Sequence, residues 1–264
     1  MDDLKFMPIP GLAEARLAKP RKTLTAQLAS WAFFILSSAF LGCAWLEYSA
    51  ETIDYVTRLG EHRRIELADN SIIDLNTDSR VSVRMSLLQR NVVVTQGEAL
   101  FKVNHNRLRP FTVKVADLQI RDVGTRFNVH KHANGATISV FEGEVELNNG
   151  HGVINEHLGA GNQRSYSETS GLGRLETVEA ENLTAWVNGQ LVFKHTPLRE
   201  VTAELERYHP LQFTFADPKL AQETLSGTFN SADIEPFLHA LETILPVQAK
   251  RNGKQIQLRR AQKN

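Results

Sequence analysis

The residues in this chain that look best suited to chemistry are two histidines, His130 and His132. Strand spacing would place both imidazoles on one face, and Asp122 lies nearby in the sequence. A metal site needs a further ligand that the fold must supply. We therefore expect solvated strand histidines here and no metal site.

Two further sets of charged residues could act on a ligand. Glu142, Glu144 and Glu146 alternate along one face of a predicted strand, where they could bind a cation or a basic partner. A carboxylate stripe of this kind is more typical of a solvent-exposed sheet face. Arg126, within residues 124–127, could orient a carboxylate, but we favour a structural ion pair or a role in a turn.

The sequence contains none of the common catalytic motifs. Gly-x-Ser-x-Gly, His-Glu-x-x-His, Walker and dinucleotide-binding signatures are all missing. The single cysteine, Cys43, falls in an apolar segment, so a cysteine nucleophile is excluded elsewhere. The 30 basic and 30 acidic residues are interspersed and cancel, so no nucleic-acid surface is indicated. We predict a protein that is not an enzyme and that uses no cofactor.

That apolar segment runs from Thr23 to Leu46 without a charged residue. As a helix it would span roughly 36 Å, enough to cross a bilayer. Basic residues precede it and the eleven residues after it contain no Lys or Arg, so residues 1–22 should form a cytoplasmic tail. We predict a single-pass membrane protein whose bulk is exported and, in a bacterium, would be periplasmic; the preceding basic residues are Lys5, Arg16, Lys19, Arg21 and Lys22.

This segment has two alternative fates. A cleaved secretory signal usually has a shorter apolar stretch of about 7–15 residues and a small-residue cleavage site. A lipoprotein signal is suggested loosely by residues 40–43, which end in Cys43, although the preceding region is long for such a signal. We favour an uncleaved membrane helix. Its small residues Ser37, Ser38 and Gly42 could weaken the helix locally and so allow a membrane protease to cut it.

Residues 50–167 show the period of two that is typical of strands. Phe111, Val113 and Val115 alternate with polar residues, and residues 139–147 would form one strand. Gly-Glu dipeptides begin at Gly60, Gly97 and Gly143, each beside a predicted strand. We predict an all-β module, sandwich-like or solenoid-like, with at most one helical turn near residues 85–88. A loose stretch, residues 168–175, opens a predicted linker over 168–186.

Residues 187–260 change to an αβ pattern that repeats after 36 residues. Thr196-Pro197 should cap a helix whose apolar face continues to Tyr208, and strands are predicted at 211–215 and 254–258. The first helical stripe, Leu198, Val201 and Leu205, aligns with Ile234, Phe237 and Leu241. Two β-α-β halves would form a small two-layer domain, whose edge strands can accept a partner strand.

Several ordered motifs resemble the FecR family of transmembrane sigma-factor regulators. Residues 55–77, with Gly60-Glu61 and Asp69-Asn70-Ser71, resemble the opening of that family, which usually has Gly where Asn70 stands. The resemblance covers roughly residues 50–260. The other matching segments are residues 96–103, 110–113, 124–129, 141–145, 186–193, 197–201 and 226–229.

The resemblance implies an inner-membrane protein of a Gram-negative bacterium that relays a signal from the outer membrane. The implied partners are the N-terminal signalling domain of a TonB-dependent receptor, typically one for ferric siderophores, an extracytoplasmic-function sigma factor, and membrane-embedded and periplasmic proteases. The repeat at 187–260 resembles the short domain found in secretins and TonB-dependent receptors. Family members usually carry a longer helical cytoplasmic domain than residues 1–22. The alternative is a membrane-anchored or lipidated scaffold without a role in transcription.

Overall fold

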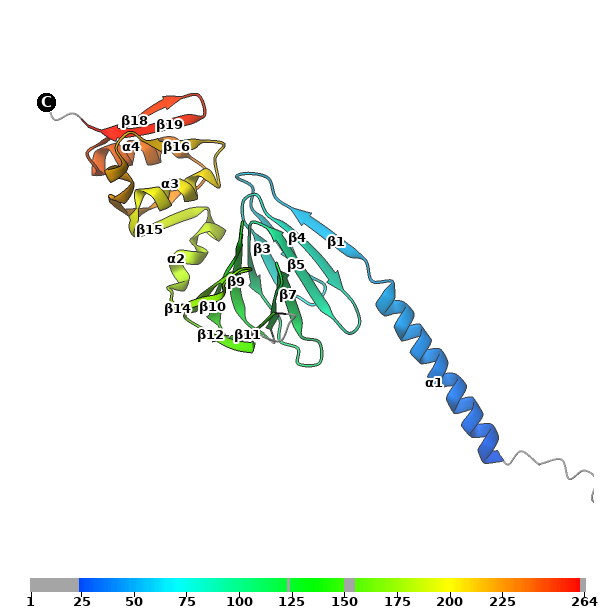
Figure 1. Cartoon of the computed structure of the whole chain (residues 1–264). Helices are drawn as coiled ribbons and strands as arrows, with labels where there is room; N and C mark the ends of the chain where they lie inside the picture. Colours follow the sequence, from blue (N-terminus) through cyan, green and yellow to red (C-terminus); the bar gives the residue numbers. More distant parts are fainter. Residues whose placement is uncertain (1–23, 123, 150–154, 262–264) are drawn as a thin grey trace, which may run out of the picture. The chain divides into compact units, whose positions relative to one another are not determined.

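The structure is a computed structural model that describes residues 24–122, 124–149 and 155–261 (Figure 1). The chain divides into two compact units, residues 1–49 and residues 50–264. The predicted cytoplasmic tail, residues 1–22, lies outside the described residues.

The described part of the first unit is one helix, α1, Leu24–Tyr48. Residues 28–48 are long and apolar enough to cross a membrane, and none of them is buried within the protein. Ser38 donates its hydroxyl proton to the carbonyl of Ile35 at 2.9 Å, so this polar group is satisfied inside the helix. The predicted apolar helix is therefore confirmed, and it runs two residues beyond the expected end at Leu46.

The β-rich part of the second unit consists of two seven-stranded sheets. The first has the order β1-β4-β5-β7-β8-β11-β12 and the second the order β14-β13-β10-β9-β6-β3-β2. All neighbouring strands are antiparallel except β5 and β7, which are parallel. The strands of the first sheet are β1 Thr52–Val56, β4 Arg80–Met85, β5 Arg90–Gln96, β7 Phe111–Val115, β8 Leu118–Asp122, β11 Glu144–Asn149 and β12 Asn155–Gly159. Those of the second are β2 Arg63–Glu66, β3 Ile72–Leu75, β6 Glu98–Lys102, β9 Arg126–His132, β10 Gly135–Glu142, β13 Asn162–Ser167 and β14 Gly171–Thr177.

The inward side chains of both sheets form one apolar core, as expected of a sandwich. Phe111, Val113 and Val115 of β7 are fully buried, in agreement with the predicted alternation. Phe101 and Phe127 stack in this core with ring centroids 5.0 Å apart. Of the two predicted architectures, the sandwich is the one that the structure has.

The three Gly-Glu dipeptides mark points where the chain passes from one sheet to the other. Gly60, Gly97 and Gly143 have φ angles of 76°, 75° and 76°, in the left-handed region that favours glycine. Gly143 separates β10 of the second sheet from β11 of the first. The prediction of one strand over residues 139–147 is therefore wrong, because the chain turns out of the sheet at Gly143.

Two other expectations about the β module need correction. Residues 86–89 do not form a helical turn; they are a bend that joins β4 to β5, which pair as far as Met85 and Arg90. Residues 171–177 are not loose, because they form β14 and pair with β13. The rest of the predicted linker contains the short helix α2, Ala180–Thr184, and a 3₁₀ turn at Ala185–Asn188.

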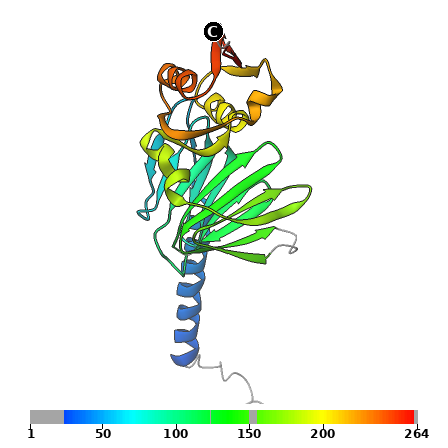
Figure 2. The ribbon, with the colours of Figure 1, turned by 90° about the vertical axis from the view of Figure 1, so that its left-hand side faces the viewer.

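The C-terminal module contains both predicted β-α-β halves. Its helices α3, Leu198–Glu206, and α4, Ile234–Ile244, appear in yellow and orange in Figure 2. The strands are β15 Gln190–Pro197, β16 Gln212–Phe215, β17 Thr224–Asn230, β18 Val247–Asn252 and β19 Gln255–Arg260, with a 3₁₀ turn at Pro218–Gln222. β15 pairs with β17, and β16 lies parallel to β19, whose other neighbour is β18. The strand β18 was not predicted.

This module has an apolar core of its own, distinct from that of the sandwich. Leu198, Val201 and Leu205 of α3 are fully buried in it, together with the repeated stripe of α4. The predicted cap is wrong: β15 continues through Pro197, and the hydroxyl of Thr196 accepts a hydrogen bond from the Lys194 amide. Burial of its stripe therefore positions α3 without a side-chain cap, whereas α4 also has one, because the Asp233 carboxylate accepts a hydrogen bond from the Glu235 amide at 3.2 Å.

Candidate functional site: a charged junction between the sandwich and the C-terminal module

The predicted histidine pair lies at one end of the sandwich. The rings of His130 and His132 have centroids 4.3 Å apart at the end of β9. His132 is exposed as expected, whereas His130 is partly buried. Asp122 belongs to β8 in the opposite sheet, and the described residues contain no group of three or more metal-ligating side chains.

The predicted carboxylate stripe is divided between two sheets, and each of its members has an arginine or histidine neighbour. Glu142 lies 3.8 Å from Arg126, which therefore makes the structural ion pair that we favoured. Glu144 lies 2.8 Å from His157, and Glu146 lies 3.9 Å from Arg121. These exposed pairs stabilise a folded protein only weakly, and the three carboxylates do not converge on one point.

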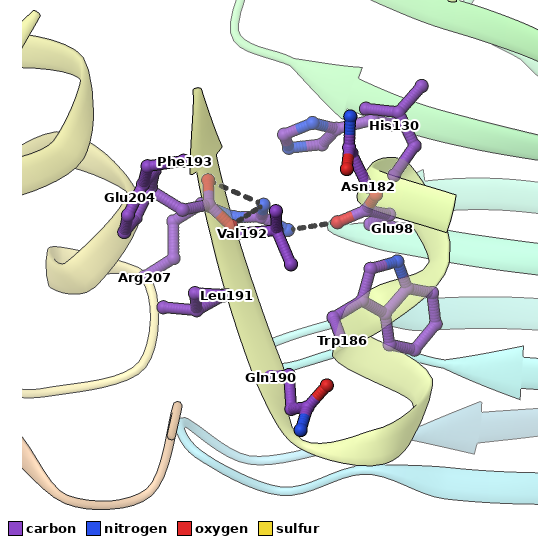
Figure 3. A pocket seen from close by; sticks show the side chains of 11 residues that line it. Glu98, His130, Asn182, Trp186, Gln190, Leu191, Val192, Phe193, Glu204 and Arg207 are labelled. Atoms are coloured by element: carbon purple, nitrogen blue, oxygen red, sulfur yellow. Dashed lines mark hydrogen bonds and ion pairs between the residues drawn. The ribbon is translucent and has the colours of Figure 1, made fainter. Parts of the chain in front are cut away.

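The charged residues that do converge are Glu98 and Arg207. Arg207, which follows α3, places a guanidinium nitrogen 2.6 Å from Oε2 of Glu98 on β6 of the sandwich. Its other terminal nitrogen donates to both carboxylate oxygens of Glu204, at 2.7 and 2.9 Å. Figure 3 shows Arg207 between the two carboxylates. One arginine of the C-terminal module thus joins its own helix to the sandwich.

Amide side chains complete the hydrogen bonding of the Glu98 carboxylate. Asn76 donates to Oε2 at 2.7 Å and Asn128 donates to Oε1 at 2.8 Å. The same amide group of Asn76 lies 2.9 Å from the hydroxyl oxygen of Tyr208. Glu98 is 6% exposed and Asn76 is fully buried. A buried carboxylate with this many donors is held in one orientation.

Backbone and ring contacts surround this ion pair. Thr77 donates its hydroxyl proton to the carbonyl of Arg207 at 2.8 Å and accepts from the Gly60 amide at 2.7 Å. The imidazole of His62 stacks on Trp186, with centroids 6.0 Å apart, and lies 5.7 Å from the ring of Tyr208. We call Asn76, Thr77, Glu98, Asn128, His130, Glu204, Arg207 and Tyr208 the charged junction.

The electrostatics of the junction follow from burial and from Arg207. Burial alone raises the pKa of Glu98, but the Arg207 charge and the hydrogen bonds from Arg207 and Asn76 bring the pKa below its ordinary value. Burial raises the pKa of Glu204 despite the opposing effect of Arg207. Burial also lowers the pKa of His130 to about 4, since Glu98 opposes this effect only in part. At neutral pH the junction therefore holds a charged Glu98–Arg207 pair beside a neutral imidazole.

A pocket of about 170 Å³ opens at the junction. Glu98, His130, Glu204 and Arg207 line its polar side, and Trp186 and the strand β15 line the rest (Figure 3). All four polar residues belong to the junction, and both carboxylates already bind Arg207. We interpret this site as a structural connection between two modules, because its charged side chains pair with one another across them.

The sequence pattern alone does not predict the junction. It places Glu98 in a Gly-Glu dipeptide, Tyr208 at the end of an apolar helical face and His130 in a histidine pair, and it does not bring the three together. A signal was present, because Glu98 precedes Ala99, Leu100 and Phe101, all four of which are buried. A carboxylate that opens a continuous buried strand needs a cation, but nothing in the sequence indicated that Arg207 supplies it.

We expect the stability of residues 50–264 to depend on pH through His130. The folded state holds this imidazole neutral, with a pKa of about 4 against an ordinary 6.5, so unfolding takes up a proton once the pH falls below 6.5. One pKa unit corresponds to about 1.4 kcal/mol, so the loss between pH 6.5 and pH 4 amounts to about 3 kcal/mol. Urea denaturation at several pH values measures this loss.

The His130→Gln variant should show a flatter stability profile between pH 6.5 and pH 4 than the parent. The matched control is His157→Gln, which replaces an exposed histidine of β12. The Glu98 contribution falls in a lower range, since a lowered carboxyl pKa costs stability only below its ordinary value of 4.5. Parallel profiles for His130→Gln and the parent would contradict the assignment.

The geometry defines a class of protein: a two-module, β-rich body with a structural junction, preceded in the chain by one apolar helix. Residues 53–146 match the family model described as FecR protein, and residues 190–258 match the one described as FecR, C-terminal. The two matches together cover more than half of the chain. The chain belongs to the FecR family.

Solved structures with the same fold come from Parabacteroides distasonis ATCC 8503. They are two crystal structures of a candidate anti-sigma factor, at 1.65 Å and 2.50 Å resolution. Their sequences are 24% and 23% identical to this chain, with TM-scores of 0.67 and 0.66. Each similarity covers 80% of this chain and 100% of the other. No curated protein matches the chain.

Proposed function

We propose that this protein is a membrane-anchored regulator of a sigma factor. Both family models match in order, and both matches follow one apolar helix in the chain. This order is the observation that carries the proposal, because a membrane-anchored regulator needs an anchor and a folded sensing body. The candidate anti-sigma factor with the same fold supports the same class of function.

In this proposal the tail of residues 1–22 lies in the cytoplasm of a Gram-negative bacterium and meets an extracytoplasmic-function sigma factor. The body, residues 50–264, faces the periplasm. The excess of Lys and Arg before α1 supports this orientation. Proteases in and near the membrane would release the tail from its anchor.

The proposed periplasmic partner is the N-terminal signalling domain of a TonB-dependent receptor, for example one that imports ferric siderophores. The two β-α-β halves are compatible with the short domain of secretins and TonB-dependent receptors. In the three-stranded sheet, β16 and β18 are edge strands, so either can take a partner strand by backbone hydrogen bonding. A strand added there would need no catalytic residue, and we propose that the protein is not an enzyme.

Two binding experiments test the proposal separately. Residues 1–25 should co-purify with a sigma factor encoded near this gene, and the purified body should bind the signalling domain of the neighbouring receptor. If only the sigma factor fails to bind, the protein is better explained as an envelope scaffold without a role in transcription. Failure of both would overturn the proposal.

The proposed orientation has its own test. An enzyme that is active only in an oxidising compartment is fused behind Asn264 and compared with the same enzyme fused before α1. We expect the enzyme fused behind Asn264 to be active. Activity of the enzyme fused before α1 alone would show that the orientation is the opposite of the proposed one.

A further inference from the structure

Two loops at one end of the sandwich expose leucine side chains. Leu87 and Leu88, in the bend between β4 and β5, are 49% and 68% exposed, and Leu108, before β7, is 93% exposed. A single exposed leucine is ordinary, but three on neighbouring loops call for an explanation. We call residues 86–89 and 104–110 the leucine loops.

The leucine loops are fixed in place by hydrogen bonds. The Arg90 side chain, 1% exposed, donates to the carbonyls of Arg109 at 2.6 Å and Asn104 at 2.9 Å. The Arg109 guanidinium donates in turn to the Ser86 carbonyl and so links the two loops. Asn106 accepts from the Leu108 amide at 3.0 Å. A buried arginine thus organises a loop whose tip is an exposed leucine.

The leucine loops and the ends of β4 and β5 beside them carry charge of one sign. Residues 84–90 and 104–110 contain Arg84, Arg90, Arg107 and Arg109 and no acidic residue. Asp69, in the turn between β2 and β3, is 2.6 Å from Arg90 and neutralises that buried charge. Arg107 is exposed beside Leu108. Apolar tips with neighbouring arginines are the combination that binds an anionic lipid surface.

Chain connectivity brings this end of the sandwich to the membrane. β1 pairs with β4 so that Thr52 lies opposite Arg84, and the Arg84 side chain donates to the Ala50 carbonyl at 3.3 Å. Ala50 therefore lies at the same end as the leucine loops. Ser49 alone separates it from the last residue of α1, and two residue steps reach about 7 Å at most.

We infer that the leucine loops contact the surface of the anionic bilayer that α1 crosses. Leu87, Leu88 and Leu108 enter the interfacial layer, and Arg107 meets lipid phosphates. The junction with the C-terminal module involves residues 76–77, 98 and 130, at the opposite ends of the same strands, so this contact leaves that module free to bind a partner. The inference rests on membrane insertion of α1 and not on the sigma-factor proposal.

Quenching by spin-labelled lipids tests the contact in the full chain. Cys43 is replaced by serine, and single cysteines at Leu108 or Leu87 carry an environment-sensitive fluorophore. The chain is placed in nanodiscs of phosphatidylethanolamine and phosphatidylglycerol, with one chain in each disc. The matched control is a cysteine at Ile244, an apolar residue of α4 that is 55% exposed. A cysteine at Leu36 in α1 reports insertion of the helix independently.

We expect quenching at positions 108 and 87 to exceed that at position 244 by about twofold or more, and to decrease when phosphatidylglycerol is omitted. Quenching at 108 no greater than at 244, with position 36 quenched, would overturn the inference. A signal at 108 that is absent from discs with one chain and appears only in a second preparation with two chains in each disc would also overturn it, because a second copy would then cover the loops. Equal quenching without phosphatidylglycerol would overturn the role of Arg107.

Discussion

Replacing Arg207 with alanine is expected to lower the free energy of unfolding of residues 50–264 by about 3 kcal/mol or more. The substitution removes the cation that faces Glu98 across the junction and leaves that carboxylate buried with only amide partners. Removing one partner of a buried pair costs more than the pair contributes, because the remaining charge loses its compensation. Urea denaturation at pH 7 measures the loss.

The loss should be smaller in acid. Without Arg207 the buried carboxyl of Glu98 would have a raised pKa, since burial alone raises it and the largest opposing effect is gone. Protonation then relieves the uncompensated charge in the folded state. Arg207→Ala should therefore be closer to the parent at pH 5 than at pH 8, a difference that a simple loss of packing would not produce.

Glu98→Gln is the matched control for this pair. Arg207 keeps its two hydrogen bonds to Glu204, and the amide oxygen introduced at position 98 can still accept from Asn128, so the cost should be smaller, about 1–2 kcal/mol. The double variant completes a thermodynamic cycle that isolates the coupling between the two side chains. A loss below about 1 kcal/mol for Arg207→Ala would contradict the junction, because exposed ion pairs contribute that little.

The pattern of apolar residues predicted the main elements of this fold. A run without charge from Thr23 to Leu46 predicts one long apolar helix, and α1 begins and ends within two residues of it. The stripes of α3 and α4 were predictable because each helix buries one face in a local core. Local periodicity is therefore sufficient to predict an element when its own sequence determines which of its faces is buried.

Periodicity does not predict the points at which the chain leaves one sheet and enters the other. At Gly143 the alternation continues from Phe141 to Val145, yet the backbone leaves one sheet and enters the other. The edge strand β14 was missed because Arg174 and Glu176 make it mostly solvent-exposed, so it lacks an apolar face. Such a strand is specified by the backbone hydrogen bonds of its neighbour, β13, and not by its own sequence.

The charged junction could not be predicted because its partners are far apart in sequence. Glu98 and Arg207 are separated by 109 residues, and Asn76 and Tyr208 by 132. Each residue alone has an ordinary interpretation as a turn carboxylate or as part of a helical face. Their structural role depends on how the C-terminal module packs against the sandwich, and no local sequence pattern predicts that packing.

Replacing Gly97 with alanine is expected to destabilise residues 50–264 by about 3–5 kcal/mol. Gly97 adopts a φ of 75°, where an L-residue is strained by about 1–2 kcal/mol. An added Cβ would also lie 2.6 Å from the carbonyl oxygen of Asp78 and from the Cα of Ser79. These are backbone atoms, so the β5–β6 crossing itself must shift. Urea denaturation measures the total.

Gly161→Ala separates the two contributions to that loss. Gly161 has a φ of 79°, and a Cβ there would meet nothing within 4 Å, so this variant should cost only the strain of about 1–2 kcal/mol. Since Gly97 precedes Glu98, a shifted crossing should also misplace that carboxylate and weaken its coupling to Arg207. The cycle between Glu98 and Arg207, repeated in the Gly97→Ala background, should then give a smaller coupling energy. Equal losses for the two glycine variants would mean that the backbone between β5 and β6 can shift without further loss of stability. The turn at Gly97 would then not be what holds Glu98 in position.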